Sequence, residues 1–211
     1  MAILSSWVLL VFATAVYCRS YWPGEQELPR KIVHIGVGPI VPLAWWLDVP
    51  RIVAIPVALT ITLAALVNHR WHMFHAIEDV QRRSYGTVAY GLAITVMLLL
   101  YWPAQPAAVC AGTLVMAFGD GFAGLAGQTL RSPSWHLGNQ QKSVAGTAVM
   151  AVTSCLVLTT LILLSGSALP LLRLLLVTGL LVGLEQLSSL GLDNLTVPLA
   201  AALSWDWLIL P

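Results

Sequence analysis

Long apolar stretches dominate this sequence and limit the folds that are open to it. An α-helix needs about 17–25 mostly apolar residues to cross a bilayer. Stretches near that length lie at residues 2–18, 32–47, 51–67, 86–102, 106–127, 143–166, 168–190 and 195–210. Backbone N–H and C=O groups in lipid must be hydrogen-bonded within the protein, so such stretches fold as helices. Since the second and the last are marginal, the sequence predicts an all-α polytopic membrane helix bundle with seven or eight transmembrane helices, in one domain over residues 1–211.

The amino-acid composition also indicates a membrane protein. Hydrophobic residues make up 58% of the 211 residues and charged residues only 9%, whereas a soluble domain carries about 25% charged residues. The net charge of +1 leaves no basic face for a nucleic-acid partner. We therefore expect an integral membrane protein that does not bind nucleic acid.

The loop charges predict an orientation. Cytoplasmic loops of membrane proteins carry an excess of Lys and Arg. Three, three and two such residues fall in the loops at 19–31, 68–85 and 128–142. One, none and none fall in the loops at 48–51, 103–105 and 165–168. The first set is expected on the cytoplasmic face, and most unusual polar residues of the chain lie on or beside that same face.

Asp120 is the most unusual polar residue, because the apolar stretch 106–127 surrounds it. A charged side chain at a helix centre costs roughly 2.5–3.5 kcal/mol on insertion scales. Asp120 could be neutralised by Arg173, the one arginine deep within another stretch. A metal site is favoured, since Mg²⁺ takes one or two carboxylates together with nucleotide phosphates.

Two basic segments have both a structural and a functional interpretation. Arg30 and His34 are four residues apart and share a helical face, as a membrane anchor or as a phosphate clamp. Lys142 and Ser143 open the stretch 143–166, where they serve as a helix cap or bring an ammonium, a hydroxyl and free N–H groups to an anion. The spacing is not that of a Walker A motif.

Acidic residues mark the last two stretches. Glu185 lies near the end of one stretch among apolar neighbours, with no adjacent cation. Asp193 and Asn194 open the next stretch, where an N-cap is as good an explanation as a ligand.

Taken together, five segments resemble the CTP-dependent polyprenol kinase family, which includes phytol, farnesol and dolichol kinases, and most of all its phytol kinase branch. They are Arg30-Lys31-x-x-His34, Arg83-Ser84-Tyr85-Gly86, Phe118-Gly119-Asp120-Gly121-Phe122-Ala123-Gly124-Leu125-Ala126-Gly127, Lys142-Ser143-x-x-Gly146-Thr147-Ala148-x-Met150 and Asp193-Asn194-Leu195-Thr196-Val197-Pro198-Leu199. Each segment is short, but their order and spacing extend over most of the chain.

The resemblance implies transfer of the γ-phosphate of CTP, with Mg²⁺, to the hydroxyl of a long-chain isoprenoid alcohol. On this basis the expected catalytic residues are Asp120, Lys142, Glu185 and His34. The expected nucleotide-binding residues are Arg30, Lys31, Arg83, Ser143 and Asn194, and the expected Mg²⁺ ligands are Asp120 and Asp193. Either Glu185 or His34 would accept the alcohol proton.

Two other functions fit parts of the sequence. A CTP-dependent cytidylyltransferase that makes a CDP-activated lipid also combines a multi-helix membrane fold with CTP and Mg²⁺, although the chain lacks the His-Gly-Gly…Asp pattern of CDP-diacylglycerol synthases. A small membrane transporter would use Asp120, Arg173 and Glu185 as charges along a pathway. The polar residues crowd one face instead of crossing the midplane, which favours the kinase.

Overall fold

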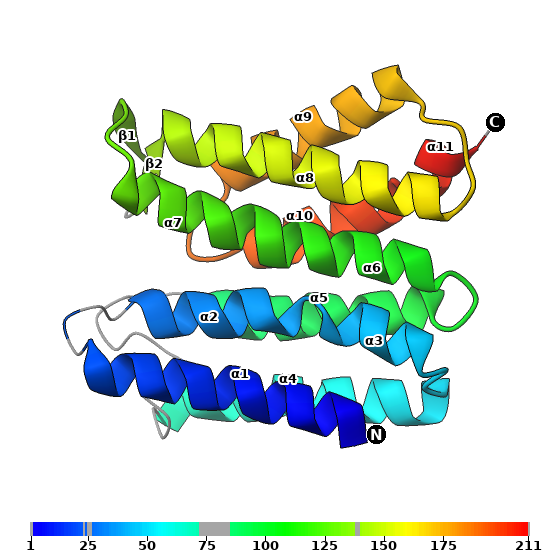
Figure 1. Ribbon diagram of the computed structural model, residues 1–211, viewed down its shortest axis with the longest axis horizontal. Coiled ribbons are helices and arrows are strands. Elements are labelled where there is room, and N and C mark those ends of the chain that lie inside the picture. The colour runs from blue at the N-terminus through cyan, green and yellow to red at the C-terminus, as the bar shows by residue number, and fades with distance from the viewer. Residues whose placement is uncertain (1, 23, 25–26, 72–84, 138–139, 211) are drawn as a thin grey trace.

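The computed structural model describes residues 2–22, 24, 27–71, 85–137 and 140–210. Its helices lie roughly side by side along the long axis of the molecule (Figure 1), which confirms the expected all-α bundle. The first group of helices is α1 (Ala2–Tyr21), α2 (Glu27–Val37), α3 (Ile40–Trp46), α4 (Arg51–Trp71) and α5 (Gly86–Tyr101). The second group is α6 (Pro106–Leu114), η1 (Val115–Asp120), α7 (Gly121–Thr129), α8 (Val144–Leu164), α9 (Leu171–Leu187), α10 (Asp193–Leu203) and α11 (Trp205–Ile209).

Within the described residues, four helical units are long and apolar enough to cross a membrane. They are Ala2–Tyr21, Arg51–Trp71, Val144–Leu164 and the rod Pro106–Thr129, which joins α6, η1 and α7. Helix α5 is apolar but shorter. The predicted stretch 32–47 is divided between α2 and α3 at Gly38 and Pro39, because proline has no N–H to continue a helical hydrogen-bond ladder. The total of seven or eight spans stays a prediction.

A short β-hairpin occupies part of the segment that the sequence analysis left without regular structure. Strand β1 (Ser134–Leu137) pairs with β2 (Gln140–Ser143) in antiparallel register, and Trp135 lies opposite Lys142. The Ser143 hydroxyl accepts a hydrogen bond of 3.1 Å from the Gly146 N–H and so caps α8. The hairpin therefore places Lys142 beside the first turn of that helix.

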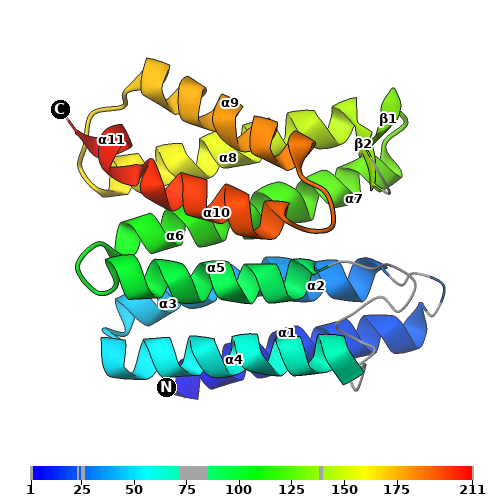
Figure 2. The ribbon, with the colours of Figure 1, turned by 180° about the vertical axis from the view of Figure 1, so that it is seen from behind.

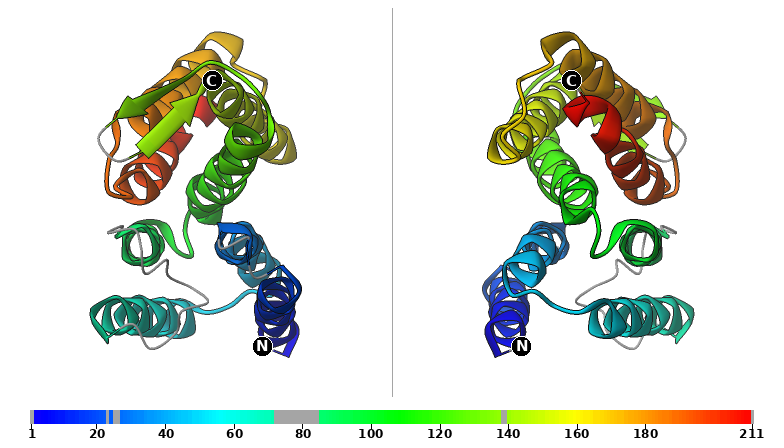
Figure 3. Two further views of the ribbon diagram at one scale, coloured as in Figure 1. Left: turned by 90° about the vertical axis from the view of Figure 1, so that its left-hand side faces the viewer. Right: turned by 90° about the vertical axis from the view of Figure 1, so that its right-hand side faces the viewer.

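The core lies among α5, α6, η1, α8 and α10. Its largest fully buried side chains include Met97, Met116, Met150 and Leu158. The end views in Figure 3 show two limbs below this core, with α4 beyond α5 on one side and α1 beyond α2 and α3 on the other. Large apolar side chains remain exposed along α1, α4 and α9, which is the expected surface of a helix that faces lipid.

The helix ends that carry the unusual polar residues share one end of the molecule. The N-termini of α2, α8 and α10 and the C-termini of α7 and α9 all point toward the end that holds the hairpin (Figures 1 and 2). The polar residues at these helix ends therefore lie in one region of the molecule, as the alternating loop charges predicted.

Candidate active site

Asp120 is the last residue of the π-helical turn η1, at the junction with α7. Its Oδ2 lies 2.9 Å from the Lys31 Nζ and 3.4 Å from the His34 Nε2, and both partners belong to α2. The Lys31 ammonium also donates to the Asp120 carbonyl at 3.2 Å. Single π-turns inside α-helices often occur at functional sites. Here the turn ends at the carboxylate that the sequence analysis placed first.

Glycine allows α2 to approach α7 closely at this point. A Cβ atom at Gly124 would lie 2.6 Å from the Lys31 Nζ, so only glycine leaves room for the ammonium in this position. A Cβ atom at Gly121 would lie 2.4 Å from Ile35 Cγ1. The glycines around Asp120 therefore seat the α2 side chains, and Lys31 is the cation that pairs with Asp120.

Glu185 forms a second buried ion pair at the end of α9. The Lys142 Nζ contacts the Glu185 Oε1, and both side chains are less than 10% exposed. Lys142 also donates to the Glu185 carbonyl at 2.9 Å. Gln186 donates to the Glu185 Oε2 at 2.5 Å and to the Thr147 hydroxyl at 2.9 Å. Both carboxylate oxygens of Glu185 therefore accept hydrogen bonds, which fixes the side chain as an oriented anion.

Asp193 supplies the third carboxylate, from the first residue of α10. It is only 5% exposed, and its Oδ1 accepts hydrogen bonds from the backbone and side-chain nitrogens of Asn194 at 3.0 and 3.2 Å. Burial, and then the nearby Asp120 carboxylate, raises the pKa of Asp193 to about 6. No ion pair to Asp193 is present among the residues that the structure describes.

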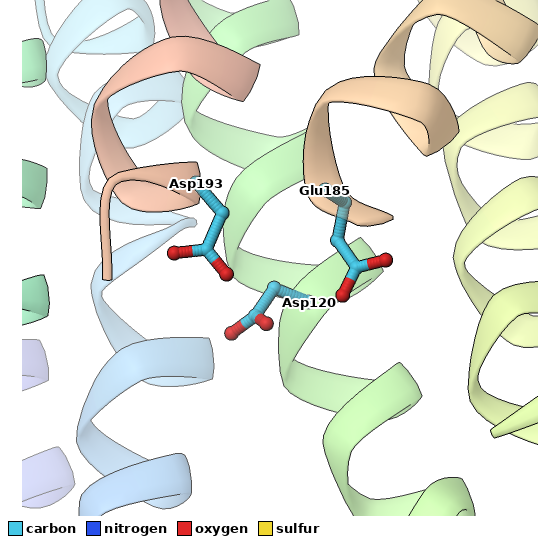
Figure 4. A group of neighbouring side chains, drawn as sticks. All are labelled: Asp120, Glu185 and Asp193. Atoms are coloured by element: carbon cyan, nitrogen blue, oxygen red, sulfur yellow. The ribbon is translucent and has the colours of Figure 1, made fainter. Parts of the chain in front are cut away.

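The three carboxylates converge from three elements. One oxygen each from Asp120, Glu185 and Asp193 lies within 4.8 Å of the others, and Figure 4 shows the side chains pointing toward one another. Three carboxylates against the two ammonium groups of Lys31 and Lys142 leave an excess of negative charge. Oxygen ligands of this kind suit Mg²⁺. The donor set thus fits a divalent cation, with Glu185 added to the two ligands expected from the sequence.

These groups line one end of a cavity of about 1680 Å³. The polar end also contains Arg30, Ser143 and Asn194, and the rest of the cavity extends among apolar side chains of α1, α3, α4 and α5. A charged end joined to an apolar interior fits an amphiphilic ligand, whose head and tail need different environments.

The remaining predicted residues have varied surroundings. Arg30 forms an ion pair with Glu27, while its Nε is buried and has no hydrogen-bond partner among the described residues. Arg83 lies outside the described residues. Arg173 does not neutralise Asp120, because its Nη1 donates to the carbonyls of Trp207 and Leu210 near the C-terminus.

Sequence reasoning did not select Gln186, Thr147 or Tyr90. Gln186 donates to Glu185, Thr147 accepts a hydrogen bond from Gln186, and the Tyr90 ring lies 4.8 Å from the His34 ring. Two positions could have indicated a role in the site from the sequence alone. Gln186 follows Glu185 directly, and Thr147 belongs to the segment that carries the family resemblance. Nothing in the sequence indicates that Tyr90 contacts His34, 56 positions away on another helix.

Comparison with known proteins identifies the family. A phytol kinase from Synechocystis sp. is 38% identical over 192 residues, which cover 86% of this chain and 82% of the relative. No protein-family model and no solved structure matches the chain. An identity of this level over nearly the whole length confirms the resemblance drawn from the five segments. The chain belongs to the phytol kinase family.

Proposed function

We propose that this protein is a prenol kinase that transfers the γ-phosphate of CTP to the hydroxyl of a long-chain isoprenoid alcohol such as phytol. The family supports a kinase that acts on a prenol, and the choice of CTP follows from the sequence resemblance. One structural observation carries the proposal most directly. Three carboxylates, of which Glu185 and Asp193 are buried and Asp120 is partly buried, meet two lysines at the polar end of an otherwise apolar cavity.

Cationic side chains would receive the triphosphate. Phosphoryl transfer depends mainly on positioning and on neutralising charge around the transferred group. Lys31 and Lys142 lie beside the carboxylates, and Arg30, which pairs with Glu27, lines the same end of the cavity. Asn194 would contribute amide hydrogen bonds, while the Ser143 hydroxyl is engaged in capping α8. The predicted contribution of Arg83 remains part of the proposal.

Asp120, Asp193 and Glu185 would hold Mg²⁺. A bound Mg²⁺ would neutralise charge on the phosphoryl oxygens and help to orient them. Lys31 pairs with Asp120, and Lys142 pairs with Glu185. Each lysine thus places a positive charge beside one of the proposed Mg²⁺ ligands.

His34 is the better candidate to accept the alcohol proton. Glu185 would be committed to Mg²⁺, and its two oxygens also accept hydrogen bonds from Lys142 and Gln186. The His34 Nε2 lies 3.1 Å from the Met116 carbonyl, to which a neutral imidazole would donate. That tautomer leaves Nδ1 as the acceptor. In the proposed reaction the alcohol oxygen bonds to the γ-phosphorus, the bond to the β–γ bridging oxygen breaks, CDP leaves and the proton moves to His34.

We further assign the site to the cytoplasmic face of a multi-pass membrane protein. The loops at 19–31 and 128–142, which flank the site, belong to the positively charged set. CTP is a water-soluble anion, so the polar end of the cavity needs access to the compartment that supplies it. The alcohol would reach the same point from the bilayer.

The test is phosphate transfer from γ-labelled CTP to phytol in membranes that contain the protein, with Asp120→Asn as the blank. We expect labelled phytyl phosphate and free CDP from the unaltered protein only. Parallel reactions with ATP, GTP and UTP decide the donor. Release of pyrophosphate in place of CDP would instead identify a cytidylyltransferase, and solute flux in proteoliposomes without product would identify a transporter.

A further inference from the structure

The apolar part of the cavity has two walls whose register can be read from side-chain contacts. Helices α4 and α5 are antiparallel: the rings of His69 and Tyr85 lie 4.6 Å apart at one end. Halfway along, the hydroxyls of Thr62 and Thr95 are 3.0 Å apart. At the other end, Arg51 donates to the Leu99 carbonyl at 2.7 Å. Positions on α4 can therefore be assigned a depth along α5.

The cavity begins at the carboxylates and ends at a tryptophan. At the polar end, Tyr90 packs against His34, which contacts Asp120. At the other end, Trp102 is only 3% exposed, and its indole N–H donates to the Val49 carbonyl at 2.9 Å. Both Tyr90 and Trp102 line the cavity. The hydrogen bond links the indole to the segment that follows α3.

The length of this space matches a particular class of alcohol. Twelve helical steps from Tyr90 to Trp102 rise about 18 Å at about 1.5 Å per residue. The main chain of a C20 prenol, extended from its hydroxyl, is about 20 Å long when each C–C bond of about 1.5 Å is projected on the chain axis. A C15 prenol is shorter by about four bonds, or about 5 Å. A C20 tail with its hydroxyl at the carboxylates would thus reach the indole.

We propose that the prenyl tail of the acceptor lies along this groove and that Trp102 with Val49 sets the upper limit of its length near C20. The inference rests on the proposed function, which supplies the alcohol. Ala54 and Ala58, one helical turn apart on α4, form part of the wall. By the register above, Ala54 lies near the depth of Leu100 and Ala58 near that of Thr95–Met97. Their small side chains leave the width that a methyl-branched tail needs.

On one side the described part of the groove is bordered by α1 and α4. Phe12 and Ile61 line it from these two helices and are 38% and 61% exposed. Figure 3 shows the two limbs standing apart at this side. A tail can therefore enter sideways from the lipid without passing through water, while its advance toward Trp102 is limited.

The test fills the groove at two depths. The new side chain in Ala54→Phe should block only the part of the groove next to Trp102. The side chain in Ala58→Phe lies one helical turn closer to the carboxylates and should block the groove from that depth onward. Leu59→Phe is the matched control, because Leu59 is 46% exposed on the same helix and does not line the cavity. The measurement is kcat/KM for geraniol, farnesol and geranylgeraniol, together with binding of each radiolabelled alcohol to the solubilised protein.

We expect Ala54→Phe to lower kcat/KM for geranylgeraniol relative to farnesol by at least about 10-fold, the scale of discrimination by pocket shape. Ala58→Phe should also reject farnesol and retain geraniol, and Leu59→Phe should leave all ratios unchanged. Retained use of the shorter alcohol shows that each variant is folded. If the ratios of kcat/KM between alcohols are unchanged in both Ala54→Phe and Ala58→Phe, the proposal is wrong. If the unaltered protein phosphorylates no alcohol, the proposed function fails, and the binding ratios still decide whether the groove measures the tail.

Discussion

The rod Pro106–Thr129 and helix α4 are both long and apolar enough to cross a membrane, yet they have opposite surroundings. In the most apolar window, 67% of the rod is buried inside the protein, against 11% of α4. The rod has small residues at the contacts, and a Cβ atom at Gly112 would lie 2.5 Å from the Pro198 carbonyl oxygen. Helix α4 instead exposes Ile52, Ile61 and Leu63. Small residues allow close approach between helices in membranes. Small residues at the contacts therefore distinguish the buried rod, which carries Asp120, from the more exposed helix α4.

The largest effect is expected where the buried rod carries its charge. Asp120→Asn keeps the shape of the side chain but removes the negative charge beside Lys31 and His34. We expect kcat for prenol phosphorylation to fall by about 10³-fold, the upper range for loss of one charge-stabilising group. Radiolabelled product formation measures it. Asp206→Asn is the control, since this exposed carboxylate lies in α11, away from the cluster. Comparable losses in both variants would contradict a special role for the rod.

The second prediction separates charge pairing from catalysis at Glu185. Lys142→Ala leaves the Glu185 carboxylate buried without its cation, and removal of one partner from a buried pair costs about 3–5 kcal/mol of folding free energy. We expect a lower thermal midpoint in detergent and loss of activity. In the double variant Lys142→Ala, Glu185→Gln, the uncompensated charge is gone, so the midpoint should recover in part while activity stays absent. Recovery of both would mean that the pair only stabilises the fold.

Part of this site could be predicted from single charged residues that lie in apolar stretches of the sequence. Asp120 stood out because it is a lone carboxylate in an apolar stretch, and Glu185 because it has apolar neighbours and no nearby cation in sequence. A buried charge costs free energy whichever residue pairs with it, so a charged residue in an apolar stretch can be recognised as unusual before the fold is known. The grouping of polar helix ends likewise followed from counting alternating loops.

Pairings between distant segments could not be predicted in the same way. Lys31 and Arg30 are adjacent in sequence, and both lie within one helical turn of His34, yet only Lys31 contacts Asp120, 89 positions away. Lys142 reaches Glu185 through a β-hairpin whose strands have only four residues each. Helix rotation sets the first contact and hairpin register sets the second. Both depend on which side chains of a distant element lie opposite, and the order of residues in one segment does not give this.

A glycine substitution sharpens the comparison, because it changes the approach of α2 without removing a charge. In Gly124→Ala, the new Cβ atom would lie 2.6 Å from the Lys31 Nζ, and the flexible lysine must move away from Asp120. We expect kcat to fall by about 10- to 100-fold, as misplacement of a catalytic group by about 1 Å can cause. The thermal midpoint should fall by less than in Lys142→Ala, because both charged groups remain present. In the control Gly179→Ala, on α9, the added methyl meets nothing within 4 Å, and activity should be unchanged.

The smallest effect is expected on the lipid-facing helix. Leu63→Ala on α4 removes a side chain that is 51% exposed and does not line the cavity. Since lipid chains replace the lost contacts, we expect the folding free energy to change by no more than about 0.5 kcal/mol, as for other surface substitutions. Activity in membranes should match that of the unaltered protein. The same truncation in the core, Leu158→Ala on α8, removes a fully buried side chain and should cost about 2–5 kcal/mol. Equal losses at the two positions would show that α4 packs against protein, either another part of this chain or a second copy, and the contrast between rod and limb would not hold.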